Sequence, residues 1–374
     1  MSIEPSALPN LKQILAIFDP QLPLEKALTP PASWYARNDV LALEREAVFA
    51  HTWQWVCTRD RLTHPGDYLT GQFFDWPYIV LVGPNGQLHA FFNICRHHGT
   101  CVAKGDGHTK TLVCPYHGWT YDLSGKLIKA PKAGASHFLR DKGIGLIPIP
   151  LITAGRFIGL RFSPTPVEIH HPHQTEIEAL DDAEFRFVAR QTYEMDCNWK
   201  VFIDNYLDGG YHVPCMHPDL ASDLDLKHYR TEILERAAMQ TCAPKDAREK
   251  TGKNQRVSSQ ARYLWIYPNF CLNQYGHWLD TNVVIPTGPK TCQVVFDYFY
   301  QGELSVKDRD SALEGSAQVQ REDMAICDMV QAGINSGIYH QGIYAPKFEA
   351  SMYQFHRWLS TDLKAGLAKY KTSE

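Results

Sequence analysis

Short apolar runs separated by turn residues characterise the chain from Trp53 to about Phe162. Runs such as YIVLVG, LHAFFNI and RFIGLRF alternate with turn signals that include Pro84-Asn85-Gly86 and Ser124-Gly125. Several short strands spaced in this way are typical of an all-β domain. We therefore predict a small all-β domain over residues 51–162.

The first 50 residues contain proline-punctuated stretches followed by one helical pattern. Apolar positions between Asp39 and His51 recur at roughly helical spacing, opposite the charged run Glu44-Arg45-Glu46. We predict a helix over residues 39–51. We expect the whole segment 1–50 to be helical and to pack on the C-terminal domain.

The pattern changes after a proline-rich stretch at 164–172, which is typical of a linker. Apolar strand candidates then begin at four positions: Tyr263, Phe270, His277 and Cys292. Residues 307–369 are helical by pattern, and little of this part alternates strand and helix as βαβ units would. We therefore predict an α+β second domain with an antiparallel sheet and helices over residues 163–374.

Composition excludes several classes of protein. Apolar residues make up 44% of the 374 residues and charged residues 21%, which is ordinary for a folded chain. The formal charge of -4 offers no broad basic surface for nucleic acid. No apolar run approaches the roughly 18 residues that cross a bilayer, and the first residues resemble neither a signal nor a transit peptide. We expect a cytoplasmic protein that binds neither nucleic acid nor membrane.

Two Cys-His pairs lie on turns between apolar runs of the β domain, in CRH at 95–97 and CPYH at 114–117. Structural zinc usually takes two cysteines from one loop and two histidines from another. Here each loop supplies one thiolate and one imidazole, as a Rieske [2Fe-2S] centre requires. We predict such a cluster on Cys95, His97, Cys114 and His117, with zinc as the alternative. We expect His98 to point away, because neighbours in an extended loop face opposite directions.

A second group of metal-binding side chains lies about a hundred residues further on, in NWKVFIDNYLDGGYHVPCMH at 198–217. Asp204, Asp208 and His212 are spaced by four, so a continuous helix would place them on one face. His217 follows five residues after His212, and Pro214 would end the helix and let the chain fold back. We therefore predict that His212 and His217 lie side by side.

Two such histidines and one distant carboxylate form the facial triad of non-haem Fe(II) oxygenases, which leaves positions open for O2 and substrate. The segment QREDMAICDMVQ at 320–331 carries acidic residues on a predicted helix. We choose Asp323 as the third ligand of a mononuclear iron. Spacing alone does not exclude Glu322 or Asp328.

With these motifs, the chain resembles the α-subunits of Rieske non-haem iron oxygenases over nearly its whole length. Within that family it resembles choline monooxygenase and the related quaternary-ammonium oxygenases. The metal motifs that carry the resemblance are CRHHGT at 95–100, CPYHGWTYDLSGKL at 114–127 and NWKVFIDNYLDGGYHVP at 198–214. Three further segments bear on the subfamily: YPNFCLNQYGHWLDTNVVIPTGP at 267–289, VVFDYFY at 294–300 and REDMAICDMVQAGINSG at 321–337.

The resemblance implies a Rieske domain joined to a helix-grip-like catalytic domain, usually in a ring-shaped homotrimer. It also implies that Asp208 links the cluster of one subunit to the mononuclear iron of its neighbour. Many relatives carry this acid three residues before the histidine, whereas Asp208 lies four before His212 and Gly209 takes the commoner position. The alternative is a local role, in which Asp208 orients His212 through its free ring nitrogen.

The resemblance further implies a monooxygenase that uses O2 and external electrons to hydroxylate a quaternary ammonium compound, first of all choline, which would become betaine aldehyde. No glycine-rich dinucleotide fingerprint occurs in the chain, so a separate reductase or ferredoxin is implied. The alternatives are oxidation or N-demethylation of glycine betaine, carnitine or a similar amine, oxidation of an aromatic compound, and a non-enzymatic electron carrier.

A quaternary ammonium group cannot donate N–H hydrogen bonds and is attracted to aromatic ring faces. Six aromatic residues of the strand-rich region are candidates for such a cage: Tyr263, Trp265, Tyr267, Phe270, Tyr275 and Trp278. Asp280 and Asp297 are candidates for a counter-charge. The competing interpretation is that aromatic residues in strands pack the core.

Overall fold

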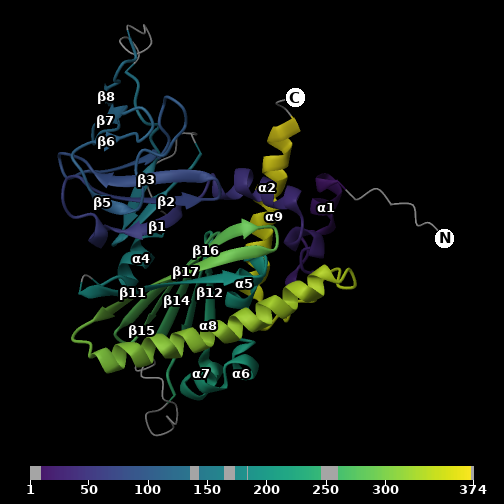
Figure 1. Ribbon diagram of the computed structural model, residues 1–374. Coiled ribbons are helices and arrows are strands. Elements are labelled where there is room, and N and C mark those ends of the chain that lie inside the picture. Colours follow the sequence, from purple (N-terminus) through teal and green to yellow (C-terminus); the bar gives the residue numbers. More distant parts are fainter. Residues whose placement is uncertain (1–9, 135–142, 164–172, 183, 246–259, 372–374) are drawn as a thin grey trace. The chain divides into compact units, whose positions relative to one another are not determined.

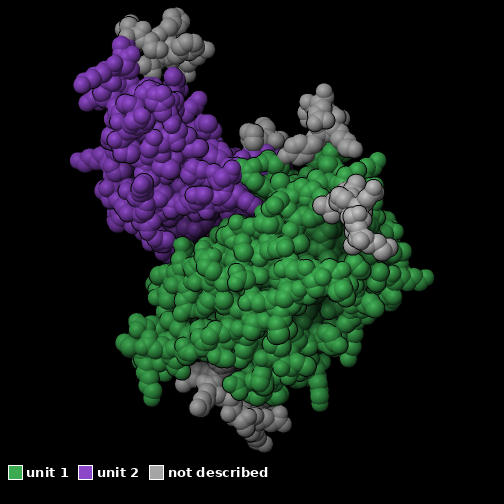
Figure 2. Space-filling view, turned by 45° about the vertical axis from the view of Figure 1, so that its right-hand side comes forward, with its two compact units in different colours: residues 1–49, 175–374 green, residues 50–174 purple. Residues whose placement is uncertain are grey.

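The computed structural model divides into two compact units, which Figure 2 colours separately. The structure describes residues 10–134, 143–163, 173–182, 184–245 and 260–371. One unit comprises residues 50–174, and the other combines residues 1–49 with residues 175–374. The segment 164–172 lies outside the described residues, so the domain limits 1–50, 51–162 and 163–374 stay predictions.

Three antiparallel sheets form in the described part of the unit of residues 50–174. The first has the order β1-β10-β9, at Gln54–Thr58, Phe157–Leu160 and Leu151–Ala154. The second has the order β4-β3-β2-β5, at Leu88–Phe92, Trp76–Val82, Asp67–Phe73 and Asp106–His108. The third has the order β6-β7-β8, at Leu112–Val113, Thr120–Tyr121 and Leu127–Lys129. The predicted all-β character is confirmed.

The core of this unit joins β3 and β4 to β6 and β7. Its buried members are Ile79, Leu81, Phe91, Cys95, Val102, Leu112, Cys114, Trp119, Tyr121 and Leu146. Two of them, Cys95 and Cys114, begin the loops that carry the first pair of metal motifs. Apolar packing therefore anchors the base of both loops.

Seven antiparallel strands form the sheet of the other unit, in the order β11-β17-β16-β15-β14-β13-β12 (Figure 1). The strands are β11 Phe185–Met195, β12 Arg230–Leu234, β13 Ala237–Cys242, β14 Ala261–Ile266, β15 Phe270–Tyr275, β16 Trp278–Gly288 and β17 Thr291–Gln301. The four predicted strands became β14 to β17. The sequence did not predict β11, because this edge strand is largely exposed and interleaves charged residues with its apolar ones.

The strand register aligns one row of side chains across this sheet. Gln240 of β13 pairs with Tyr263 of β14, and Tyr263 pairs with Asn273 of β15. Asn273 in turn pairs with Asp280 of β16. Cross-strand partners lie on the same face, so this row presents four side chains to one side of the sheet.

The helices of this unit flank the sheet. They are α1 Leu11–Ile17, α2 Asn38–Glu44, α4 Gln174–Leu180, α5 Trp199–Tyr206, α6 Val213–Met216, α7 Pro218–Asp223, α8 Val306–Asn335 and α9 Ala350–Lys371. In Figure 1, α8 crosses one face of the sheet, and α5 contacts both α8 and β16. Within the described ranges, no helix has the length and hydropathy that a bilayer crossing demands.

Helix α2 ends in a buried charged residue, Glu44, which the sequence pattern did not predict to be buried. The helix expected over residues 39–51 forms as α2 followed by a π-helical turn at Arg45–Phe49. Glu44, placed on the polar face by its spacing, is fully buried and lies 2.7 Å from the equally buried ammonium of Lys200. Glu44 also accepts a hydrogen bond from Trp199 Nε1 at 2.8 Å. These contacts tie the N-terminal segment to α5.

The tail predicted to be helical over residues 307–369 forms two helices, α8 and α9, with a non-helical break between them that the pattern did not indicate. α8 ends at Asn335, and Gly337 adopts a positive φ of 74° just beyond it. The segment between α8 and α9 pairs with the N-terminal segment, where Thr29 N–H donates to the Gly342 carbonyl at 3.0 Å. A helical pattern does not reveal such a break when the interrupting residues are themselves partly apolar.

Candidate active site

Two loops of the β unit share one backbone hydrogen-bond pattern. In the loop after β4, Gly99 N–H donates to the Cys95 carbonyl at 3.0 Å. In the loop between β6 and β7, Gly118 N–H donates to the Cys114 carbonyl at 3.0 Å. Gly99 and Gly118 have positive φ angles of 78° and 70°, which glycine adopts without steric cost. The two loops therefore have similar backbone conformations, and each places its Cys and His at equivalent positions.

The thiols lie at the base of these loops and the imidazoles at their tips. Cys95 and Cys114 are buried, whereas His97 and His117 are exposed with ring centroids 4.7 Å apart. A tetrahedral zinc ion would need all four ligand atoms within about 4 Å of one another. The described ligand atoms that gather within 4.8 Å here belong to His97, His98 and His117, without either thiol. This separation fits two irons, one bound by thiolates and one by imidazoles, better than one zinc.

His98 lies against His97, with ring centroids 3.8 Å apart. The prediction that His98 points away was wrong, because residues 96–98 form a tight turn and not an extended loop. Trp119 stacks on His97 at 4.6 Å and an interplanar angle of 3°. This stacking fixes the plane of the His97 ring.

The chain turns sharply after α5, which ends at Tyr206. Gly209 and Gly210 have positive φ angles of 70° and 77°, and a Cβ at position 209 would lie 2.4 Å from the Phe348 carbonyl oxygen. Glycine at 209 is therefore required by both conformation and space. The prediction that one continuous helix carries Asp204, Asp208 and His212 was wrong, because the helix stops before this turn.

Pro214 begins a helix instead of ending one. It lies in the first turn of α6, whose N-cap is His212, and α7 follows with His217 as its N-cap. Proline suits a first helical turn because the N–H it lacks would have no partner there. The two histidines thus flank α6, and their ring centroids lie 5.2 Å apart.

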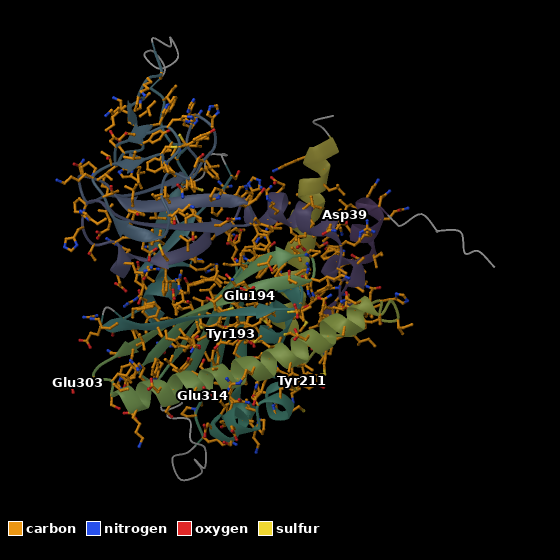
Figure 3. The ribbon with its side chains drawn as sticks, in the orientation of Figure 1. Asp39, Tyr193, Glu194, Tyr211, Glu303 and Glu314 are labelled. Atoms are coloured by element: carbon orange, nitrogen blue, oxygen red, sulfur yellow. The ribbon has the colours of Figure 1, made fainter. Side chains whose placement is uncertain are left out.

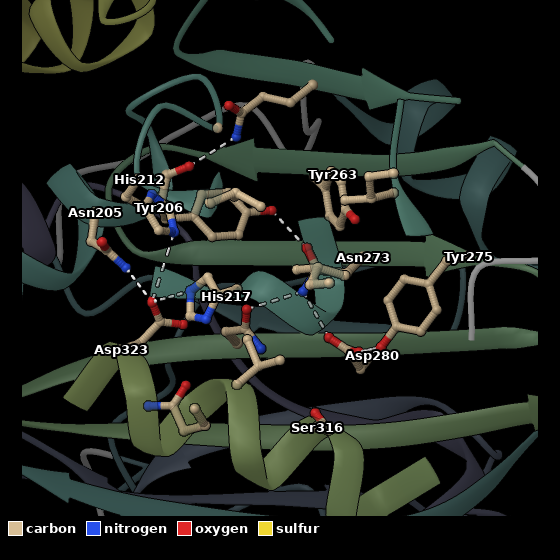
Figure 4. Close-up of a pocket in the computed structure, with 18 of the residues that line it drawn as sticks. Asn205, Tyr206, His212, His217, Tyr263, Asn273, Tyr275, Asp280, Ser316 and Asp323 are labelled. Carbon is tan, nitrogen blue, oxygen red and sulfur yellow. Dashed lines mark hydrogen bonds and ion pairs between the residues drawn. The ribbon is translucent and has the colours of Figure 1, made fainter. Parts of the chain in front are cut away.

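Asp323 extends from α8 toward both histidines (Figure 4). Its Oδ1 lies 3.1 Å from His217 Nε2 and 3.9 Å from His212 Nε2. Asn205 Nδ2 donates to the same oxygen at 2.7 Å. Among the described residues, these two imidazoles and one carboxylate form a group whose ligand atoms lie within 4.8 Å of one another. This donor set suits ferrous iron.

The two alternatives to Asp323 face other directions. Glu322 Oε2 lies 2.6 Å from His217 Nδ1, the ring nitrogen remote from Asp323. Asp328 is exposed on α8, more than one turn beyond Asp323. Burial by itself would lower the pKa of His217, but the carboxylates of Asp323 and Glu322 outweigh burial and raise the pKa. The negative electrostatic potential of these carboxylates therefore favours a positive charge, such as a cation, beside His217.

Asp208 holds His212 from the side opposite Asp323. It is buried, and its Oδ2 lies 2.7 Å from His212 Nδ1 while accepting a bond from His212 N–H at 2.9 Å. Its Oδ1 accepts from the N–H groups of Gly210 and Tyr211 at 2.9 and 3.1 Å. Asp208 therefore closes the turn and orients the His212 ring.

A cavity of about 180 Å³ opens beside His212, His217 and Asp323 (Figure 4). Six aromatic side chains line it: Phe202, Tyr206, Tyr229, Tyr263, Tyr275 and Phe296. Asp280 adds a carboxylate that is 2% exposed and accepts hydrogen bonds from Asn273 Nδ2 at 2.7 Å and from the Tyr275 hydroxyl. No Lys or Arg occurs among the described lining residues.

The predicted aromatic residues divide between this cavity and the core. Tyr263 and Tyr275 line the cavity, whereas four others are buried outside its lining: Trp265, Tyr267, Phe270 and Trp278. Trp265 stacks on Trp358 of α9, with ring centroids 6.1 Å apart, although it shares a strand with Tyr263. An aromatic residue of this strand lines the cavity only where no helix packs against its side chain, as α9 does against Trp265.

Asp297 is not a counter-charge for the cavity. Its carboxylate accepts two hydrogen bonds of 2.6 Å from the guanidinium of Arg190. Sequence reasoning also missed most of the cavity wall, including Tyr206, whose hydroxyl donates to Asn273 Oδ1 at 2.7 Å. Burial raises the pKa of Tyr206 and of Tyr229 well above the usual range, so both stay neutral phenols. Tyr206 lies on α5 and Tyr229 just before β12, so the packing of these elements on the sheet, which sequence spacing does not show, brings them together.

Comparison with known proteins identifies the families to which the two parts of the chain belong. Residues 52–148 match the Rieske [2Fe-2S] domain, and residues 182–365 match the catalytic domain of the ring hydroxylating alpha subunit. Choline monooxygenase from Arabidopsis thaliana is 39% identical over 96% of this chain and 88% of its own. The carnitine monooxygenase oxygenase subunit of Escherichia coli strain K12 is 26% identical over 84% of this chain and 86% of its own.

Solved structures share the fold. A quaternary ammonium Rieske monooxygenase bound to an inhibitor superposes with a TM-score of 0.81, over 93% of this chain and 97% of its own, at 23% identity. Naphthalene 1,2-dioxygenase from Rhodococcus sp. superposes with a TM-score of 0.70, over 90% and 94%, at 19% identity. The predicted α+β architecture is confirmed. The chain belongs to the Rieske non-haem iron oxygenases and is an oxidoreductase of the monooxygenase type, with a [2Fe-2S] cluster and a mononuclear iron.

Proposed function

We propose that Cys95, His97, Cys114 and His117 hold the [2Fe-2S] cluster and that His212, His217 and Asp323 hold the mononuclear iron. The matched loops, with buried thiols and exposed imidazoles, support the first assignment. The short distances from Asp323 Oδ1 to both imidazoles support the second. Asp208 fixes the His212 ring from its far nitrogen, as carboxylates commonly do for metal-bound histidine.

For the substrate, we propose choline, whose alcohol carbon is hydroxylated to give betaine aldehyde. The aromatic cavity with a buried carboxylate, beside the proposed iron ligands, carries this proposal. Aromatic faces and an anion attract a trimethylammonium cation, which offers no N–H donor. About 180 Å³ is small beside the roughly 300–1,000 Å³ of sites for drug-sized ligands, so the cavity favours a substrate of few heavy atoms. Relatives named for choline oxidation, at 34–39% identity, point the same way.

Hydrogen bonds fix the cavity wall that faces the cation. The Tyr206 hydroxyl donates to Asn273, and Asn273 and Tyr275 donate to Asp280. These two donors are neutral groups, and they orient the Asp280 carboxylate. The aromatic rings exclude water around the ammonium group, which strengthens its attraction to the carboxylate. The alcohol carbon then lies toward the His212, His217 and Asp323 end.

The overall reaction consumes choline, O2, two electrons and two protons, and it yields water and the hydrate of betaine aldehyde. When bound, the mononuclear iron supplies O2 activation and the cluster supplies electrons one at a time. His212, His217 and Asp323 would hold the iron with three protein ligands, and such a set would leave positions for O2 and substrate. The electrons come from a separate reductase or ferredoxin, since the chain has no dinucleotide fingerprint.

We further propose a homotrimer in which Asp208 links the cluster of one subunit to the iron of its neighbour. The exposed His97 and His117, with Tyr116 62% exposed beside them, suit a docked partner. A second cavity of about 200 Å³ has Asp208 and Tyr339 in its lining, and Ile338 next to Tyr339 is 84% exposed. Residence in the cytoplasm stays a prediction from the sequence; the relatives from Arabidopsis thaliana and Spinacia oleracea are named chloroplastic.

Turnover against a substrate panel tests the proposed function. Purified protein with a matching reductase is offered choline, glycine betaine, carnitine and a simple arene, and the products are identified. We expect betaine aldehyde from choline at the highest kcat/KM. Release of formaldehyde from glycine betaine or carnitine would instead show that the protein N-demethylates that amine, and the choline assignment would fail. Oxidation of the arene alone would contradict the quaternary ammonium assignment.

Neutralising the cavity carboxylate is expected to weaken choline binding. Asp280→Asn should raise the KM for choline at least about tenfold, or about 1.4 kcal/mol, because it removes the anion facing the cation. Tyr275→Phe is the matched control, since it keeps both the ring and the Asp280 charge. Steady-state kinetics measure both variants. An unchanged KM in Asp280→Asn would exclude Asp280 as the counter-charge.

Removing one hydroxyl is expected to lower the reduction potential of the cluster. Tyr121 is fully buried, and its hydroxyl lies 3.3 Å from Cys95 Sγ while accepting a bond from Arg96 N–H at 2.9 Å. A hydrogen bond to a ligand sulfur stabilises the reduced cluster, which carries more negative charge. Tyr121→Phe should lower the potential by tens of millivolts, since about 59 mV is a tenfold change for one electron. Redox titration measures the potential, and an unchanged value would contradict this role.

A further inference from the structure

Glu322 and Asp323 are neighbours on α8, yet they meet His217 from opposite sides of its ring. Asp323 Oδ1 lies 3.1 Å from Nε2, and Glu322 Oε2 lies 2.6 Å from Nδ1. His217 is buried at 2% exposure, whereas the Glu322 side chain is 27% exposed. Adjacent helical residues point about 100° apart, and His217 lies in the angle between them. The ring is therefore clamped between two consecutive side chains.

Two further residues of α8 hold Glu322 in place. Gln318, one turn earlier, donates from Nε2 to Glu322 Oε1 at 2.8 Å. Arg321 donates to Gln318 Oε1 at 2.8 Å and to Glu314 at 2.6 Å, and Glu314 is labelled on α8 in Figure 3. A guanidinium only donates and a carboxylate only accepts, so one orientation of the Gln318 amide satisfies both neighbours. The hydrogen bonds that run from Arg321 through Gln318 to Glu322 form a relay, and each bond in it has a fixed direction.

The relay determines which nitrogen of His217 carries the proton. Because the Glu322 carboxylate accepts, the Nδ1 of His217 must donate and therefore keeps its hydrogen. In the neutral ring, Nε2 then holds the lone pair, on the side where Asp323 lies. We propose that Glu322, held by Gln318, is the positioning residue that sets the tautomer and plane of His217 for metal binding. This inference rests on the proposed assignment of His217 as an iron ligand.

The position of Glu322 separates this role from substrate binding. Glu322 is not a described lining residue of the aromatic cavity, whereas His217 and Asp323 are. It lines a different, smaller cavity of about 140 Å³ together with Gln318 and Asp219. Its loss should therefore lower kcat and iron retention while the KM for the organic substrate stays the same. A general loss of structure would not divide the kinetic constants in this way.

The experiment measures how fast a ferrous chelator removes the mononuclear iron from anaerobic, fully loaded protein. Loss of the hydrogen-bond partner of a metal-bound histidine typically costs about 10–100-fold in metal affinity. We expect release about 100-fold faster in Glu322→Ala and about tenfold faster in Glu322→Gln, which keeps an acceptor oxygen but loses the charge. The visible spectrum of the cluster reports folding of the unit of residues 50–174, and circular dichroism with thermal melting reports folding of the unit that carries α8.

Asp328→Asn is the matched control, because it neutralises an exposed acid on the same helix and should release iron at the wild-type rate. Gln318→Ala should accelerate release less than Glu322→Ala, and combining the two should add nothing to Glu322→Ala alone. A wild-type release rate in Glu322→Ala, or additive effects in the double variant, would overturn the proposal. If His217→Ala itself released iron at the wild-type rate, the ligand assignment would fail instead.

Discussion

Replacing Asp323 with alanine is expected to abolish substrate oxidation while leaving the Rieske cluster in place. Asp323 is the one carboxylate within the described group that also contains His212 and His217. Without its charge, two neutral imidazoles remain as the proposed protein ligands, and iron binding at this site collapses. We expect turnover to fall by more than the about 100-fold that follows loss of a mere hydrogen-bond partner.

Iron analysis and spectroscopy check this result. The iron content is expected to fall from about three to about two atoms per chain, because the cluster keeps its pair. Asp328→Ala, an exposed acid on the same helix, should keep both the iron and the activity. Full activity in Asp323→Ala would remove Asp323 from the iron site. Circular dichroism and thermal melting show whether the unit that carries Asp323 is folded in the variant.

Replacing Asp208 with alanine is expected to stop coupled turnover while the cluster spectrum and its reduction persist. In the local role, the loss of two bonds to His212 lowers metal binding and activity by about 10–100-fold. In the bridging role, electrons no longer reach the iron of the neighbouring subunit, and turnover falls further. A decrease well beyond about 100-fold therefore indicates the bridge.

Hydrogen peroxide separates these roles, because it supplies oxygen already reduced by two electrons. Peroxide-driven oxidation should survive in Asp208→Ala if Asp208 mainly conducts electrons, and it should fall with iron retention if Asp208 mainly orients His212. Asp219→Asn, an exposed acid of α7, serves as control and should behave like the wild type. Normal coupled turnover in Asp208→Ala would exclude both roles.

The loops that begin at Cys95 and Cys114 could be predicted because their chemistry is local. Each loop compresses its ligands and its turn glycine into a few consecutive residues, so spacing alone indicates the arrangement. The choice of the third iron ligand among Glu322, Asp323 and Asp328 could not be made from local spacing. It depends on the rotation of α8 about its axis, which packing on the sheet determines and which sequence spacing leaves open.

One wrong prediction and one unpredicted break have a common physical origin. The helix expected to continue through Asp208 stops because Gly209 and Gly210 adopt positive φ, and contact with Phe348 favours that turn. The helical tail breaks where its residues pair with a segment near Thr29. In both cases a partner distant in sequence overrides a helical pattern, so local periodicity could not reveal the outcome.

The sequence indicated that aromatic residues of the strand-rich region would line a cavity, but not which ones. Tyr263 and Tyr275 were among the candidates, whereas Tyr206 and Phe296 reach the cavity from α5 and β17. Trp265 shares a strand with Tyr263 yet packs on α9. The strand register and the helix that packs on each strand determine which aromatic residues line the cavity, and the sequence of one strand shows neither of them.

The row formed by Gln240, Tyr263, Asn273 and Asp280 has an evolutionary consequence. Each of these residues comes from a different strand, and the ladder that joins the strands uses backbone groups alone. Exchange of one side chain in the row therefore leaves the backbone ladder in place, while its effect on the cavity floor spreads only through side-chain bonds such as that from Asn273 to Asp280. A lineage with this sheet can thus change the floor of its cavity by substitutions in the row while the strands keep their pairing.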